Sequence, residues 1–424
     1  MDKNELNTTF SNSLTPGPYY LKPNEFSIEH FTLPIALLND KGENDLLMVR
    51  SESVEIARDV PQGLEIGLRH YWYPILLSEE LKQDKPVEVS CLGEELVVWR
   101  GQGGLPSVLT DRCPHRSAKL SLGRVLDGEL QCAFHGLRFD KEGRCVLIPW
   151  ESDDSPSRNE VSARAYPARE LGGYVWVYPG DPAQFPPPPL EKEIPEELLN
   201  EEEYLWFRMP TEMWDANWLL TVDGGDGFHA VILHSDTQAV ENKTWQGGKV
   251  QRPSAGLTER RVKIVETAYG VRGIAVDREG KPIHHGHLLE VKGDRFILPC
   301  ITTNVIRPVP GVEPYVARLW QFPADERRTV VQRFVVQRVK NDQERERWEK
   351  LYHEVVRPRL EGISREDAMI AASQGDLRAS RANEHLFEPD RSMYEVRLRI
   401  KEAFVMQRNG NRVAPTEASV VWPV

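Results

Sequence analysis

The chain has 424 residues, of which 40% are hydrophobic and 28% are charged, and its formal net charge is −12 at pH 7. This length is sufficient for two domains with substantial cores, and the composition is that of an ordinary soluble protein. The chain contains neither a long basic stretch nor an apolar run long enough to cross a bilayer. We therefore expect no binding to nucleic acid and no membrane span.

The N-terminal region and the cysteine content both favour a cytoplasmic protein. Residues 1–65 are largely polar and rich in proline, and we expect them to form an extension packed partly on the body. The first residues lack the basic and apolar segments of a signal peptide. Three of the five cysteines, Cys91, Cys145 and Cys300, have no expected ligand role. We expect them to be reduced, partly buried thiols.

Residues 66–180 have the pattern of a small antiparallel β domain. Two strand-like segments at 87–89 and 96–99 are separated by a turn signal and predict a β-hairpin. A further strand is expected at 174–178. The next segment, 181–199, contains a run of four prolines. Such a run is stiff and extended, so this segment is predicted to be the linker between two domains.

Residues 200–424 are predicted to form a second domain with an antiparallel sheet flanked by helices. Strands are expected at 262–265, 271–276, 296–298, 315–320 and 330–336. The last two flank a turn at 323–326 and are predicted to pair. The charged segment 341–356 predicts a helix that ends before Pro358. The predicted fold class is therefore α+β.

Within the first domain, two cysteines and two histidines follow the spacing C-x-H-x16-C-x2-H. They are Cys113, His115, Cys132 and His135. A Rieske [2Fe–2S] centre needs this mixture, because two thiolates bind one iron and two imidazoles bind the other. The alternative is a zinc site, but zinc fingers group their cysteines together and their histidines together. The alternating order favours the Rieske cluster.

A second set of metal-ligand types follows the spacing D-x2-H-x4-H, formed by Asp226, His229 and His234. Two histidines and one carboxylate on one face of an Fe(II) ion form the facial triad of non-haem oxygenases. A regular helix turns about 100° per residue, which places the two imidazoles roughly 140° apart. We therefore expect a π-bulge, or a helix that ends before His234.

Together, these motifs resemble the oxygenase component of Rieske non-haem iron oxygenases, in particular the phthalate-type and carbazole-type branch. The resemblance covers roughly residues 66–390. It implies a [2Fe–2S] cluster, a mononuclear Fe(II) ion and a homotrimer. It also implies electrons from NAD(P)H through a separate reductase or ferredoxin. With O2, such an enzyme hydroxylates, dihydroxylates or dealkylates a small organic substrate, which is typically aromatic.

The third ligand of the mononuclear iron must be a carboxylate, and the resemblance favours Asp367 in a late helix. Glu366 and Asp376 are the alternatives. The segment from Ser364 to Asp367 also resembles a capping box, which would give Asp367 a purely structural role.

In the resembling family, an aspartate three residues before the first iron histidine links it to a cluster histidine of the neighbouring subunit. By position this residue is Asp226, with His135 as its expected partner. Asp223 is the rival, because the spacing upstream of His229 looks one residue shorter than usual.

A different class of function also remains open. The chain could be a Rieske electron-transfer protein without oxygenase activity, in which the second domain serves only assembly. Iron analysis separates the two, since an oxygenase holds about three irons per chain and a carrier holds about two.

Overall fold

The computed structural model describes residues 58–226, 229, 233, 234, 237, 261–266, 270–276, 296–306, 314–387 and 390–413. All of them belong to one compact unit, Val49–Val424. Most of the expected N-terminal extension lies outside the described residues. Its last residues are described, and Val60 and Leu64 among them are buried in the main hydrophobic core.

The first half of the described chain forms three small antiparallel sheets. The first has the order β1 (Tyr73–Leu77), β11 (Tyr174–Val177), β10 (Ala168–Leu171). The second has the order β2 (Val87–Cys91), β3 (Glu94–Arg100), β4 (Pro106–Thr110), β9 (Ala165–Tyr166). The third has the order β5 (Arg124–Leu126), β6 (Glu129–Gln131), β7 (Arg138–Phe139), β8 (Cys145–Leu147). The expected hairpin is confirmed as β2 and β3, joined by Leu92 and Gly93, whose φ angles of 52° and 76° suit a tight hairpin turn.

The second half contains an eight-stranded antiparallel sheet. Its order is β12 (Tyr204–Arg208), β19 (Thr329–Arg338), β18 (Tyr315–Pro323), β17 (Ile301–Ile306), β16 (Phe296–Ile297), β15 (Gly270–Val276), β14 (Arg261–Glu266), with β13 (Glu212–Trp214) also paired to β19. The five expected strands are confirmed, although β16 is shorter than predicted and Leu298 already lies in a turn. The predicted pair is β18 and β19, in register from Val316 opposite Val336 to Pro323 opposite Thr329.

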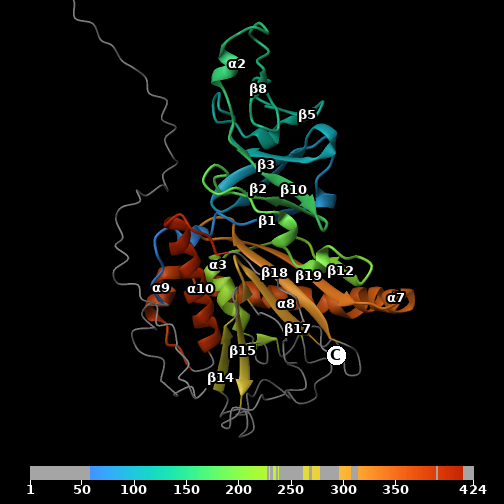
Figure 1. Cartoon of the computed structure of the whole chain (residues 1–424), viewed down its shortest axis with the longest axis vertical. Helices are drawn as coiled ribbons and strands as arrows, with labels where there is room; N and C mark the ends of the chain where they lie inside the picture. The colour runs from blue at the N-terminus through green and yellow to red at the C-terminus, as the bar shows by residue number, and fades with distance from the viewer. Residues whose placement is uncertain are drawn as a thin grey trace, which may run out of the picture. The chain divides into compact units, whose positions relative to one another are not determined.

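Most of the α-helices lie beside this sheet, whereas one short helix lies next to β8 in the first half of the chain (Figure 1). The α-helices are α2 (Ser157–Glu160), α3 (Trp218–Asp223), α7 (Asp342–Leu351), α8 (Arg357–Ser373), α9 (Leu377–Asn383) and α10 (Arg391–Arg408). The short 3-10 helices are η2 (Leu64–Ile66), η3 (Ser78–Glu80), η4 (Gln102–Gly104), η5 (Leu120–Leu122), η6 (Leu190–Lys192), η7 (Glu196–Leu198) and η8 (Gly224–Asp226). The expectation that the helix after Asn341 ends before Pro358 is wrong. A π-helical turn, η9 (Tyr352–Val356), connects α7 to α8, and Pro358 lies in the first turn of α8, where a missing N–H is tolerated.

Strand β18 is buried on both faces, which explains why seven of its nine residues are apolar. Val316, Trp320 and Phe322 belong to the main core, which also contains β1 and β11. The indole rings of Trp320 and Trp176 lie 5.4 Å apart in this core. Tyr315 and Ala317 face a second core under α7 and α8. The predicted α+β class with antiparallel sheets is thus confirmed.

The helices that matter for the site pack against one another and against the large sheet. α3 contacts β18, α8 and α10, and α8 also contacts β13. Within the described part of the chain, none of the helices combines the length and the apolar character needed to cross a bilayer.

Candidate metal centres

The two halves of the C-x-H…C-x2-H motif form loops with the same backbone closure. In the first loop, Cys113 N donates to Ala118 O at 2.8 Å and Ser117 N donates to Cys113 O at 2.8 Å. In the second loop, Cys132 N donates to Leu137 O at 2.8 Å and Gly136 N donates to Cys132 O at 3.1 Å. The residue four after each cysteine has a positive φ, 58° for Ser117 and 78° for Gly136. The two loops are therefore structural equivalents.

These loops bury the sulfur atoms and leave the imidazoles accessible. Cys113 and Cys132 are each only 2% exposed, whereas His115 is exposed and His135 is half-buried. The imidazole rings of His115 and His135 have centroids 4.6 Å apart. Burial raises the pKa of the Cys113 thiol to about 11, while backbone N–H groups of His115 and Arg116 directed at this sulfur act in the opposite direction. Such N–H groups are suited to stabilising thiolate and cluster sulfur.

The four cluster candidates are not arranged as ligands of a single zinc ion. A tetrahedral zinc site with bonds of about 2.0–2.3 Å holds its donors within roughly 4 Å of one another. Among the described residues, the one group of His, Cys, Asp or Glu donors that lie within 4.8 Å of one another is elsewhere in the chain. A thiol pair and an imidazole pair set apart from each other fit a two-iron cluster.

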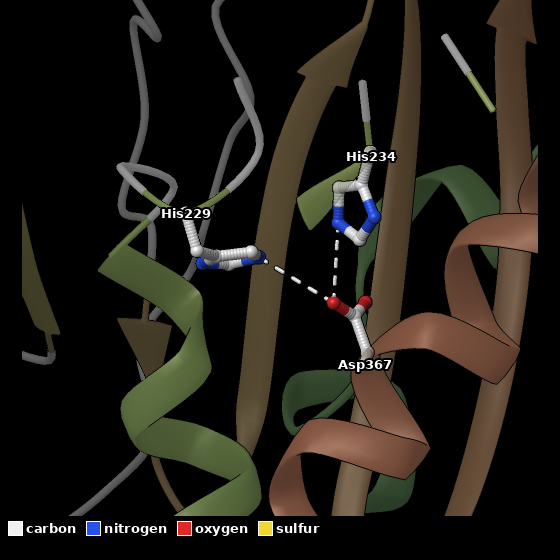
Figure 2. Close-up of side chains that lie close together, drawn as sticks. All are labelled: His229, His234 and Asp367. Carbon is white, nitrogen blue, oxygen red and sulfur yellow. Dashed lines mark ion pairs between the residues drawn. The ribbon is translucent and has the colours of Figure 1, made fainter. Parts of the chain in front are cut away.

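The second candidate centre is formed by His229, His234 and Asp367, whose donor atoms all lie within 4.8 Å of one another. Oδ1 of Asp367 is 3.4 Å from Nε2 of His229 and 3.2 Å from Nε2 of His234. Figure 2 shows both imidazoles directed at this carboxylate, which projects from α8. The structure thus brings together the three residues that the sequence proposes for the mononuclear iron.

The local backbone accounts for the approach of the two histidines. α3 ends at Asp223 and continues into η8, and a helical hydrogen bond of 2.8 Å then joins Leu233 N to His229 O. His234 lies in the turn after Leu233. A helix that ends before His234 is one of the two arrangements expected from the spacing.

The electrostatics of this centre favour a cation. Burial alone raises the pKa of Asp367, but hydrogen bonds and charge interactions with His229 and His234 outweigh burial and lower the pKa to about 2. Burial lowers the pKa of His234, but its contacts with Asp367 and Glu366 outweigh this effect and raise the pKa. Two imidazoles and one ionised carboxylate that converge on one position are the donors that bind Fe(II) in facial-triad sites.

Glu366 has a role that sequence reasoning missed. Its Oε2 lies 2.7 Å from Nδ1 of His234. A carboxylate can only accept, so Nδ1 carries the proton and Nε2 is left to face the centre. Thr237 donates to the other oxygen of Glu366. Gly362 on α8 permits this approach, since a Cβ there would lie 2.7 Å from Cγ2 of Thr237.

The surroundings of Asp376 and Ser364 do not support a metal-ligand role for Asp376 or a capping box that ends at Asp367. Asp376 caps α9, because its side chain accepts from Ala379 N at 2.9 Å. Ser364 lies inside α8 and donates to Oε2 of Glu212 at 2.6 Å. The segment from Ser364 to Asp367 is therefore not a capping box, since α8 begins seven residues earlier, at Arg357.

The two candidate bridging aspartates lie at the end of α3 and in η8. The backbone of Asp226 ends η8, and its side chain lies outside what the structure describes. Asp223 is only 8% exposed and its carboxylate accepts from Arg381 and Arg397. The role of Asp226 stays a prediction, while Asp223 is already engaged by two arginines.

Comparison with known protein families agrees with both candidate centres. Residues 71–166 match the Rieske [2Fe–2S] domain, and residues 178–403 match the homotrimeric ring hydroxylases. The second match covers more than half of the 424 residues. The chain belongs to the homotrimeric ring hydroxylases. The cofactors of a ring hydroxylase with a Rieske domain are a [2Fe–2S] cluster and a mononuclear iron, and the donor sets described above fit both.

Several known oxygenases are similar to this ring hydroxylase in sequence or in fold. The 3-chlorobenzoate-3,4-dioxygenase oxygenase subunit of Comamonas testosteroni is 38% identical over 43% of this chain and 40% of that protein. The phthalate 4,5-dioxygenase oxygenase subunit of Pseudomonas putida is 30% identical over 63% of this chain and 58% of that protein. The chain therefore spans less than two thirds of these relatives. The terminal oxygenase of carbazole 1,9a-dioxygenase from Novosphingobium sp. KA1 shares the fold, with a TM-score of 0.62 and 24% identity over 87% of this chain and 98% of that chain.

Proposed function

We propose that this ring hydroxylase is the terminal oxygenase of a multicomponent system. It receives electrons that originate in NAD(P)H from a separate reductase or ferredoxin. With O2 it hydroxylates, dihydroxylates or dealkylates a small aromatic substrate. The observation that carries the proposal is the convergence of His229, His234 and Asp367 in a chain that also contains a Rieske domain.

In the first centre, Cys113 and Cys132 hold one iron of the cluster, and His115 and His135 hold the other. Both sulfurs are buried and both imidazoles reach the surface, so the imidazole side of a bound cluster would be the side accessible to redox partners. When bound, the cluster supplies single electrons and the mononuclear iron supplies the place where O2 is activated.

In the second centre, His229, His234 and Asp367 would hold the Fe(II) ion, which would supply the site for O2. Asp367 supplies the negative charge and remains ionised at neutral pH. Glu366 keeps the proton of His234 on Nδ1, so that Nε2 faces the metal. Asp226 precedes His229 by three residues and connects the two centres through an imidazole N–H.

The related proteins support an aromatic substrate and an assembly of three copies. The names of the relatives refer to chlorobenzoate, phthalate and carbazole. We infer a cyclic head-to-tail homotrimer in which the cluster of one subunit serves the iron of the next, because such heterologous contacts close into a ring. A cytoplasmic location is supported by Cys91, Cys145 and Cys300, which are buried free thiols.

The assembly has a complementation test. A Cys113→Ser chain lacks the cluster and an Asp367→Ala chain lacks the mononuclear iron, so each is expected to be inactive alone. Mixed trimers restore a functional pair wherever an intact cluster meets an intact iron of the neighbour. Recovery of turnover after mixing and reassembly supports electron transfer between subunits, and its absence contradicts the head-to-tail arrangement.

The chemistry is tested by product analysis with ¹⁸O-labelled dioxygen, a reductase and a panel of aromatic carboxylates and heterocycles. We expect labelled hydroxylated product, or O2-dependent release of formaldehyde from a methoxy substrate. The electron-transfer alternative predicts no labelled product and no effect of Asp367→Ala on cluster reduction or iron content.

A further inference from the structure

The carboxylate of Asp223 lies in a buried ionic network between three helices. Asp223 ends α3, Arg381 lies on α9 and Arg397 lies on α10. Their relative exposures are 8%, 3% and 5%. Glu384 follows α9 and forms a bidentate pair with Arg397, with N–O distances of 2.6 and 2.9 Å. Two buried guanidinium groups therefore face two carboxylates, and the partly exposed Arg58 also lies 3.7 Å from Glu384.

Both oxygens of Asp223 are engaged in this network. Oδ1 accepts from Nε of Arg397 at 3.0 Å. Oδ2 accepts from Nη2 of Arg397 at 2.8 Å and from Nη2 of Arg381 at 3.2 Å. Breaking a buried ion pair by removing one partner leaves an uncompensated charge, which is strongly unfavourable. Asp223 is therefore firmly fixed relative to α9 and α10.

Asp223 is also the last firmly held side chain before the iron motif in the part of α3 and η8 that the structure describes. Gly224 and Gly225 follow it, and a third glycine, Gly227, precedes His229. Glycine allows many backbone conformations. A Cβ at Gly224 would meet no atom within 4 Å, whereas one at Gly225 would lie 3.3 Å from Cγ2 of Thr302, so close packing restrains the second position but not the first. The direction in which the chain continues toward His229 thus depends on how α3 is anchored at Asp223.

The same network reaches the other half of the candidate iron site. α9 begins directly after Asp376, three residues beyond the end of α8, and α8 carries Asp367. α3 and α8 also contact each other, and α10 contacts α3 and η8. Arg381 therefore ties the helix that precedes His229 to the helix pair that presents Asp367.

We propose that Asp223 is a positioning residue of the iron site. Through Arg381 and Arg397 it fixes the histidine-bearing segment relative to α8, and this sets the affinity of the site for Fe(II). The inference rests on the proposed iron ligands, but it gives Asp223 no contact with metal or substrate and no part in electron transfer.

The test is Fe(II) binding by the iron-depleted full-length protein, measured by anaerobic competition with a chelator. Asp223→Asn keeps the size of the side chain and removes its charge. We expect Fe(II) affinity to fall roughly 10–100-fold, the range found when partners of metal ligands are removed, while the visible absorption of the Rieske cluster is unchanged. The double variant Asp223→Asn/Arg381→Gln restores the balance of charge and is expected to recover part of the affinity.

A matched control separates positioning from general stability. Glu197→Gln breaks another buried ion pair, with Arg318, in which both side chains are 0% exposed. This variant is expected to melt at a lower temperature and to bind Fe(II) like the wild type. Arg381→Lys keeps the charge but not the geometry, and it decides the matter if Asp223→Asn fails to fold.

Wild-type Fe(II) affinity in Asp223→Asn, or in Arg381→Lys where the first variant does not fold, would overturn the positioning role. An equal loss of affinity in Glu197→Gln would overturn it as well, since any loss of stability would then weaken the site. A wild-type protein that binds no Fe(II) would contradict the proposed iron site itself, and the inference with it.

Discussion

The cluster loops and the candidate mononuclear iron site use similar side chains but are held in place differently. Each cluster loop is closed by its own backbone, with two hydrogen bonds that join residues four and five positions apart. The iron site instead joins residues 229 and 234 to α8, and the contact between His234 and Glu366 spans 132 positions. The first centre depends on local conformation, whereas the second depends on the packing of helices.

This difference determines how each centre responds to change. A cluster loop keeps its shape as long as its turn residues are compatible with the backbone, even if distant helices shift. The segment that leads to His229 has few backbone restraints of its own, since η8 begins with Gly224 and Gly225 and is followed by Gly227. Its geometry is set by side-chain contacts such as the one between Glu366 and His234. Substitutions in the two regions should therefore have separable effects on the two metals.

The largest expected effect comes from Asp367→Ala. This change removes the proposed carboxylate ligand and should abolish turnover and mononuclear iron binding, because two imidazoles alone hold Fe(II) poorly. The cluster loops share no contact with Asp367 among the described residues, so the Rieske absorption should be retained. Iron content should fall from about three to about two per chain, measured by elemental analysis with the visible spectrum.

The reciprocal control is Cys113→Ser, which should abolish the Rieske absorption and leave the mononuclear iron. If Asp367→Ala retains all its iron, the carboxylate ligand is another residue, and Glu366→Ala is the next variant to analyse. If each variant loses both metals, the two centres are not independent. The distinction between a centre held by its local backbone and one held by helix packing would then be wrong.

A smaller effect is expected for Asp226→Asn. Asparagine keeps the size of the side chain but loses the charge that favours an imidazole N–H donor. Both metals should remain, and reduction of the cluster by its partner should survive. Turnover should fall roughly 100-fold because transfer from cluster to iron is impaired, and rapid mixing with reduced partner would show a reduced cluster that is not reoxidised. If this variant turns over normally, and Asp223→Asn shows slow electron transfer from cluster to iron at full iron content, then Asp223 is the bridging residue.

Glu366→Gln tests whether Glu366 orients His234 in the candidate iron site. The amide no longer ensures that Nδ1 of His234 is the protonated nitrogen, so Fe(II) affinity should fall about tenfold. Glu361→Gln is the control, because Glu361 lies on the same helix and pairs only with the half-exposed Arg357, 2.8 Å away, among the contacts described for it. Equal Fe(II) affinities of the two variants would show that Glu366 does not orient His234.

The sequence predicted the parts of this molecule that local patterns determine. The α+β class, the hairpin of β2 and β3, the pair of β18 and β19 and the cluster motif all follow from spacing over a few residues. Helix ends were less predictable. Pro358 looked like a stop signal, but the π-helical turn before it lets the chain continue into α8.

The candidate iron site could be predicted only in part. The histidine pair is local, and its spacing required the break before His234 that the structure contains. Glu366 and Asp367 are adjacent carboxylates, and one residue of rotation on α8 decides which faces the imidazole Nε2 atoms. Only the placement of α8 against the histidine segment gives Asp367 this position and Glu366 the contact with Nδ1 of His234.

The smallest expected effect tests the equivalence of the two cluster loops. Gly136 and Ser117 occupy the same left-handed position, which costs an ordinary residue about 1–2 kcal/mol. Gly136→Ala should therefore destabilise its loop by about that amount, and its Cβ would also lie 3.1 Å from Cγ of Pro149. Ser117→Gly removes a comparable strain from an exposed site but adds about 0.5–1 kcal/mol of backbone entropy to the unfolded chain, so it should stabilise its loop by only about 0.5–1 kcal/mol. The temperature at which the Rieske absorption bleaches measures both variants. Because the closure is local, neither change should alter Fe(II) affinity at the second centre, and a loss of iron in Gly136→Ala would mean that the cluster loops are coupled to the packing of α8.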